Sequence, residues 1–104
     1  MDNATASRIR VEIDQELMPV VPNYLEKRLS DCAEIGHLLA TGRMEYIQIM
    51  GHRMKGSGGS FGFEEISVIG EELESAAQIT DADAIRSAVG RLEEYLKHVS
   101  VAYI

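Results

Sequence analysis

Apolar residues recur at steps of three and four along most of this 104-residue chain, and no other feature limits its fold as strongly. This spacing places apolar side chains on one face of an α-helix, where neighbouring helices can bury them. The periodicity predicts four helices, over about residues 24–40, 43–57, 63–79 and 82–103. Pro19 and Pro22 separate the first of them from residues 9–17, for which we predict a separate short helix rather than a kinked lead-in.

Sustained alternation of apolar and polar residues is missing, so the sequence offers no evident strands. The expected fold class is therefore all-α. Because short connections make sequential helices neighbours, we expect an antiparallel up-down four-helix bundle with a short extra N-terminal helix. The length suits one core, so residues 1–104 are expected to form a single domain, with about residues 1–20 as the N-terminal helix or lead-in.

The charge balance narrows the choice of partners. Seventeen acidic against ten basic residues give a formal net charge of −7, which opposes binding to nucleic acid. No apolar run approaches the roughly 20 residues needed to cross a bilayer, and the N-terminus lacks the pattern of a secretory signal. The single cysteine, Cys32, cannot form an internal disulfide. These features predict a cytoplasmic protein that binds other proteins and does not insert into a membrane.

Chemically useful side chains concentrate around His52 in the second predicted helix. The core-facing stripe of that helix consists of Ile47, Met50 and Met54. At about 100° per residue His52 projects roughly opposite this stripe, so its ring is expected to be exposed. A neutral imidazole keeps a lone pair near neutral pH and can attack phosphorus without a separate base. Lys55, one helical turn further on, supplies positive charge for a phosphoryl group.

Four residues near His52 each have a functional and an ordinary interpretation. Gly56 costs about 1 kcal/mol relative to alanine in a helix, and it either clears space for another protein or marks helix unwinding or close packing. Ile49 belongs either to a docking patch or to the apolar residues that any surface carries. Gln48 is either a hydrogen-bond donor near a phosphoryl group or a solvated polar residue. Arg53 is interpreted as surface charge rather than a ligand.

The run His52-Arg53-Met54-Lys55-Gly56-Ser57, followed by Gly62 and by Leu73-Glu74, resembles the signature of histidine-containing phosphotransfer (HPt) domains. The resemblance covers most of the chain and implies a four-helix bundle that carries a phosphoacceptor histidine. It implies that His52 is phosphorylated on its outer ring nitrogen, that Lys55 steadies the phosphoryl group and that Gly56 clears space for a receiver domain. The partner-binding residues expected beside Gly56 are Gln48, Ile49, Arg53 and Ser57.

A phosphorelay is the function that this resemblance implies. His52 takes a phosphoryl group from a sensor histidine kinase, or from the receiver domain of a hybrid kinase, and passes it to a response regulator. The chain is then a carrier without kinase activity, either as a whole protein or as one domain of a larger kinase. No cofactor is expected on the chain itself, because the partner receiver domain supplies Mg²⁺.

Other functions compete with phosphotransfer. A pure interaction domain would bind its partner through the acidic surface and Ile49, and it would tolerate replacement of His52. A metal-binding bundle needs several ligand pairs, and Glu34 with His37 is unaccompanied by a second, so no metal site is expected. An enzyme is disfavoured because the sequence has neither a nucleotide-binding glycine loop nor a Ser–His–Asp set. We assign no role to His37 or His98.

Overall fold

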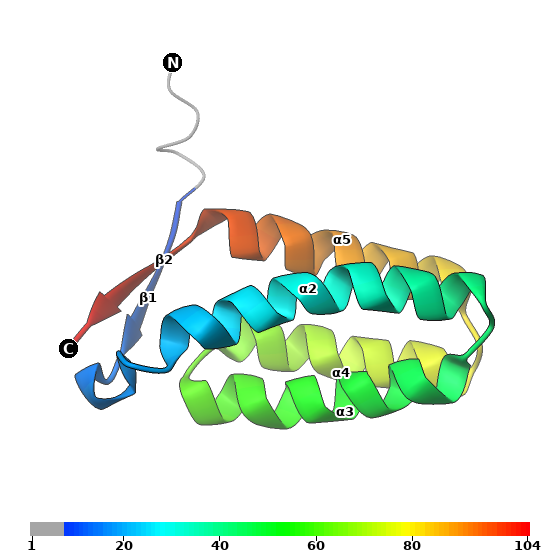
Figure 1. Ribbon diagram of the computed structural model, residues 1–104, viewed down its shortest axis with the longest axis horizontal. Coiled ribbons are helices and arrows are strands. Elements are labelled where there is room, and N and C mark those ends of the chain that lie inside the picture. Colours follow the sequence, from blue (N-terminus) through cyan, green and yellow to red (C-terminus); the bar gives the residue numbers. More distant parts are fainter. Residues whose placement is uncertain (1–7) are drawn as a thin grey trace, which may run out of the picture.

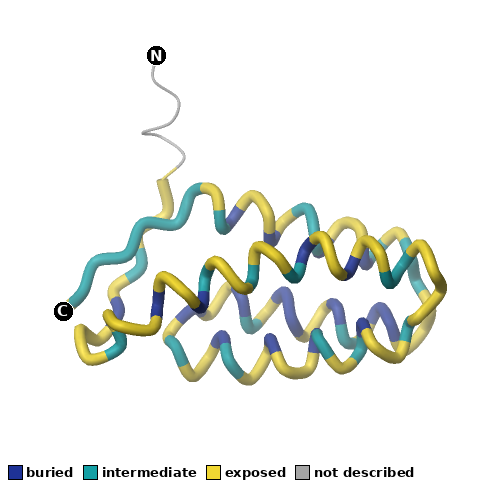
Figure 2. Tube along the Cα trace, viewed as in Figure 1, coloured by how far each residue is buried: buried dark blue, intermediate teal, exposed yellow. Residues whose placement is uncertain are grey.

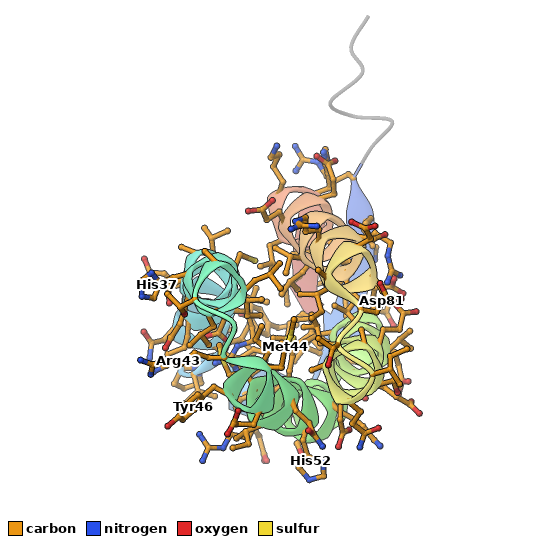
Figure 3. All side chains as sticks on the ribbon, turned by 90° about the vertical axis from the view of Figure 1, so that its right-hand side faces the viewer. His37, Arg43, Met44, Tyr46, His52 and Asp81 are labelled. Atoms are coloured by element: carbon orange, nitrogen blue, oxygen red, sulfur yellow. The ribbon has the colours of Figure 1, made fainter. Side chains whose placement is uncertain are left out.

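The computed structural model describes residues 8–104, and most of these residues belong to four helices. The helices are α2 (Val21–Ala40), α3 (Met44–Phe61), α4 (Glu64–Gln78) and α5 (Ala82–His98). They lie side by side and are joined by short connections (Figure 1). Both α2 and α4 contact α3 and α5, so the four helices surround one core, as the end-on view of Figure 3 shows. The predicted helical bundle is confirmed.

The N-terminal segment corrects one prediction. Ile9–Ile13 form strand β1 rather than a helix, and Gln15–Leu17 form the single-turn 3-10 helix η1. β1 pairs in parallel with β2 (Val99–Tyr103), so α5 ends at His98 and not near residue 103. The expectation of an all-α chain without strands is therefore wrong at this end of the molecule. Residues 1–7, part of the predicted N-terminal helix or lead-in, lie outside the described residues.

The strand signal of β1 is real but short, since Ile9–Ile13 alternates apolar and charged residues over only five positions. Each strand is five residues long, and a short strand is stable only when another strand pairs with it. Val99 and Tyr103 also continue the apolar stripe of α5 at a four-residue step, which favours helix in any local analysis. Pairing joins Ile9 to Val99 across nearly the whole chain, and it buries Ile13 at the edge of the core.

Helix α3 continues through its glycines to Phe61, beyond the predicted end near residue 57. A Cβ atom at Gly51 or Gly58 would lie 2.6 Å from a backbone nitrogen of α4, and a Cβ at Gly70 of α4 would meet the backbone of α3. These glycines therefore let the two helices pack backbone to backbone, which repays their low helix propensity. The same close packing brings side chains of α4 beside those of α3.

Two capping arrangements fix the connections on either side of α4. Gly62 ends α3 with φ of +91°, a left-handed conformation that glycine adopts freely, and the Phe63 N–H then donates to the Gly58 carbonyl at 2.7 Å. At the start of α5, the Asp81 carboxylate accepts a hydrogen bond of 3.0 Å from the Ala84 N–H.

The space between the helices is filled by apolar side chains. Figure 2 marks the buried positions in dark blue along the trace of the chain. No polar or charged residue within residues 8–104 is buried. The large side chains that are fully enclosed include Ile35, Ile47, Met54, Phe63, Ile66, Ile69, Leu73, Ile85 and Leu92. No helix in the described part of the chain is long and apolar enough to span a membrane.

Candidate functional site

His52 stands on the outer surface of α3 and projects away from the bundle (Figure 3). Its side chain is 70% exposed, whereas Ile47 and Met54 on the opposite face of the helix are buried. Helical spacing in the sequence therefore places this ring correctly. An imidazole in this position is accessible to a reacting group carried by another macromolecule.

A carboxylate from the neighbouring helix fixes one side of the ring. Nδ1 of His52 lies 3.1 Å from Oε2 of Glu74 in α4, and the Glu74 side chain is only 20% exposed. Gly51 and Gly70 make this contact available, because the close approach of α3 and α4 sets the Glu74 backbone directly beside α3. Glu74 is thus held by its own helix and can orient the ring.

The contact with Glu74 determines which ring nitrogen of a neutral His52 is nucleophilic. A carboxylate accepts hydrogen bonds and cannot donate them, so Nδ1 carries the ring hydrogen and donates it to Glu74. Nε2 then keeps the lone pair. The geometry makes Nε2 the atom that attacks an electrophile.

Lys55 lies one helical turn beyond His52, and it also contacts helix α4. Its Nζ is 3.9 Å from Oε1 of Glu74, the second oxygen of the carboxylate that contacts the ring. The Lys55 carbonyl accepts a hydrogen bond of 2.7 Å from the Ser67 hydroxyl of α4. The Lys55 side chain is 44% exposed, so its ammonium group can move toward an anion arriving at His52.

No contact among the described residues requires a glycine at position 56. A Cβ atom there would have no heavy atom within 4 Å, so close helix packing does not explain it. The helix continues past it to Phe61, so unwinding does not explain it either. Two of the three interpretations open from the sequence, close packing and helix unwinding, are therefore excluded, and clearance for another protein stays a prediction.

The other predicted partner-binding residues occupy two different faces of α3. Ile49 is 45% exposed and Gln48 is half-buried, and they lie three and four residues before His52 on the same surface of α3. Arg53 is exposed but lines the cleft between α2 and α3. Ser57 instead turns toward α2, where its hydroxyl lies 2.8 Å from the Tyr24 hydroxyl. The structure therefore brings Ile49 and Gln48 to the neighbourhood of His52, and it places Arg53 and Ser57 toward the α2–α3 cleft.

Between α2 and α3 lies a polar cleft of about 310 Å³. Arg28 and Asp31 form an ion pair of 2.7 Å within it, and their side chains are only 15% and 14% exposed. Burial raises the pKa of Asp31, and the Arg28 guanidinium opposes that shift. Arg28 also lies over the Tyr24 ring, 4.7 Å from its centroid. These contacts are made within α2, and the Tyr24 hydroxyl connects them to Ser57 of α3.

The remaining candidate nucleophiles and ligands are less suitable. Cys32 is buried, and burial raises the pKa of its thiol to about 11, which keeps it protonated and unreactive. His98 lies 3.5 Å from Glu94 on its own helix. Within residues 8–104 no three His, Cys, Asp or Glu side chains lie close enough together to hold a metal ion.

Glu74 is the site residue that sequence reasoning did not assign. It was visible only as part of the Leu73-Glu74 pair of the family signature, without a role. Its helix is joined to α3 by a short turn, so proximity was foreseeable, but the facing residue could not be chosen without the register of the two helices. That register is set by the contacts of Gly51, Gly58 and Gly70.

Fold and site together define a class of protein: a small helical bundle that presents one oriented, nucleophilic imidazole on its surface. The family model described as Hpt domain matches residues 20–102, and the chain therefore belongs to the Hpt domain family, the histidine phosphotransfer domains of phosphorelays. A comparison with curated proteins and a comparison with solved structures each found no match.

Proposed function

We propose that this chain relays a phosphoryl group between a sensor kinase, or the receiver domain of a hybrid kinase, and a response regulator. The observation that carries the proposal is the exposed His52 ring with Nδ1 held by Glu74, which leaves Nε2 as the nucleophile. We also take the helices to form the antiparallel up-down bundle that the short connections favour.

The transfer begins when Nε2 of His52 attacks the phosphorus of an aspartyl phosphate on a receiver domain. A P–N bond forms, the P–O bond to the aspartate breaks, and its electron pair stays on the aspartate carboxylate. Nδ1 keeps its hydrogen, so the ring becomes cationic, and the Glu74 carboxylate 3.1 Å away stabilises that charge. No proton has to move in this step, and the reverse step returns the phosphoryl group to an aspartate.

Lys55 offsets the negative charge of the phosphoryl group. Its ammonium group starts 3.9 Å from Glu74, a loose contact that it can exchange for a phosphoryl oxygen. The chain itself then needs no cofactor, because the magnesium ion belongs to the receiver domain. Net direction follows from the relative stabilities of the two phosphorylated partners.

The receiver domain docks over the His52 face of α3. Gly56 and Gly59 lie on this face, where a Cβ atom at Gly56 would meet no heavy atom within 4 Å and one at Gly59 only the Ser67 hydroxyl at 4.0 Å. Ile49 offers an exposed apolar contact and Gln48 a polar contact, while exposed Arg53 lies at the edge of this face, toward the α2–α3 cleft. Ser57 takes part through the α2–α3 contact rather than by touching the partner, which changes the role proposed for it.

The proposal is tested by incubating the chain with a panel of phosphorylated receiver domains. We expect the wild-type chain to acquire phosphate that is labile in acid and stable in base, as phosphohistidine is, and His52→Gln to acquire none. His52→Gln should keep the helical circular dichroism of the wild type, because the ring is exposed. Binding of a receiver without any phosphate transfer would instead favour the alternative, an interaction domain without phosphochemistry.

A further inference from the structure

Among residues 8–104, strand β1 pairs along one edge with β2, and no strand pairs with its second, open edge. The Ile104 N–H donates to the Ile13 carbonyl at 2.9 Å, and the Gln15 N–H donates to the Ile104 carbonyl at 2.9 Å, which continues the β1–β2 ladder. Backbone groups of successive strand residues point to alternate edges. Because Ile13 points toward β2, the backbone N–H and C=O groups of Arg10 and Glu12 point to the open edge.

This open edge forms one wall of a groove of about 700 Å³. The opposite wall comes from the first turn of α4 and the last turns of α5, and it includes Glu64, Glu65, Glu94 and Tyr95. Helix α3 contributes none of the lining residues, so the groove does not include the His52 surface. Figure 1 shows β1 and β2 at one end of the bundle, beside the end of α5.

The backbone chemistry of the groove fits an extended chain. Arg10 and Glu12 offer two N–H donors and two C=O acceptors in strand geometry, the arrangement that an added strand satisfies. Their side chains form an ion pair of 3.3 Å on the outer face of β1, while Val11 and Ile13 pack on the inner face. An added strand therefore has apolar residues at alternate positions, directed at Tyr95 and the bundle.

The charge of the groove determines which charged side chains the added strand should carry. Arg10 is neutralised by Glu12, and Arg91 is paired with Glu72 outside the groove. Exposed Glu64 and Glu65 take part in no ion pair among the described residues, so the wall facing β1 is acidic. Basic residues at the positions that alternate with the apolar ones complement that wall.

We propose that the open edge of β1 binds an extended segment of a partner protein, with alternating apolar and basic residues, as a third strand. Five residues of β1 span about 17 Å, which matches a segment of five to seven residues. The site lies away from His52, so it tethers a partner to the domain while the phosphoryl group is exchanged elsewhere. This inference does not depend on the proposed phosphotransfer.

The test titrates the full ¹⁵N-labelled chain with a capped heptapeptide of alternating lysine and valine. We expect chemical-shift changes centred on the Arg10 and Glu12 amides and on Tyr95, and slower hydrogen exchange at those two amides in the complex. Arg10→Pro removes the outward N–H without touching the β2 ladder and should weaken binding about tenfold or more. Arg10→Ala keeps that N–H and should bind as well as the wild type.

A charge control completes the design. The double variant Glu64→Gln, Glu65→Gln should bind the lysine peptide several-fold more weakly and with a smaller dependence on salt. Equal binding by Arg10→Pro, equal binding of a glutamate–valine peptide, or shifts centred on α3 would each overturn the proposal. Concentration-dependent self-association that protects the Arg10 and Glu12 amides without peptide would show that a second copy of the chain fills the edge, and it would also overturn the proposal.

Discussion

At the residue level, the site depends on one carboxylate that faces both the His52 imidazole and the Lys55 ammonium group. Glu74 contacts the His52 ring with one oxygen and approaches the Lys55 ammonium with the other. It therefore orients the nucleophile and, before transfer, keeps the lysine close to the ring. In the proposed transfer, a residue with this geometry should affect the rate without being phosphorylated itself.

Replacing Glu74 tests this orienting role. Glu74→Ala should slow phosphoryl transfer about tenfold, because a charge-assisted hydrogen bond to the ring is lost, while His52 remains the acceptor. Glu74→Gln can still accept from Nδ1 and should retain more activity. The structural readout is the ¹⁵N shift of the His52 ring, which reports the population of the tautomer with hydrogen on Nδ1. An unchanged tautomer population in Glu74→Ala would remove Glu74 from the mechanism.

Gly56 allows a test of partner access that is separate from chemistry. Gly56→Gln should stabilise the domain by up to about 1 kcal/mol, because it replaces an open helical glycine, yet slow transfer from a receiver domain at least about tenfold. Phosphorylation by a small donor such as phosphoramidate should be unchanged. Gly36→Gln on α2 is the matched control, since Gly36 is equally open and outside α3. Equal rates from the receiver with both variants would show that Gly56 provides no clearance.

At the scale of elements, the contact between α3 and α4 sets the register of the site. Gly51 and Gly58 face the α4 backbone, whereas Gly59 meets only the Ser67 hydroxyl at 4.0 Å. Of two adjacent glycines in α3, Gly58 is therefore required by close helix packing and Gly59 is not. Sequence alone treats all of them as helix breakers, which is why it ends α3 too early.

Alanine substitutions distinguish these glycines. Gly58→Ala should lower the free energy of unfolding by about 2 kcal/mol, because the new methyl group meets the α4 backbone. Gly59→Ala should raise it by up to about 1 kcal/mol through helix propensity. Denaturant unfolding of both variants gives the comparison. A stabilised Gly58→Ala would mean that α3 and α4 are further apart than described.

Across the whole molecule, the features that could be predicted from the sequence are those formed by residues close together in the chain. The helices were predictable because residues such as Ile66, Ile69 and Leu73 repeat within one segment. The β1–β2 pair was not, because it joins the two ends of the described chain. His52 and Lys55 share one helix and were found together, whereas Glu74 depends on the packing of two helices.

Two buried groups, the Cys32 thiol and the Tyr95 hydroxyl, make the stability of the molecule sensitive to alkaline pH. Burial raises the pKa of Cys32 from 9.0 to about 11 and that of Tyr95 from 10.0 to about 12. The unfolded chain loses both protons at lower pH than the folded chain, so the free energy of unfolding should fall as pH rises from about 9 to about 12. Cys32→Ala should reduce this slope between pH 9 and 11, as measured by urea unfolding at each pH. An identical slope in both proteins would contradict the assigned burial of the thiol.

NMR can identify the ring nitrogen of His52 that carries phosphorus after transfer. The chain, labelled with ¹⁵N at histidine, is phosphorylated by a receiver domain, and the coupling between ³¹P and the ring nitrogens is recorded by NMR. We expect phosphorus to couple directly to Nε2 of His52, with the hydrogen still on Nδ1. Phosphorus bonded to Nδ1, or to any residue other than His52, would contradict it.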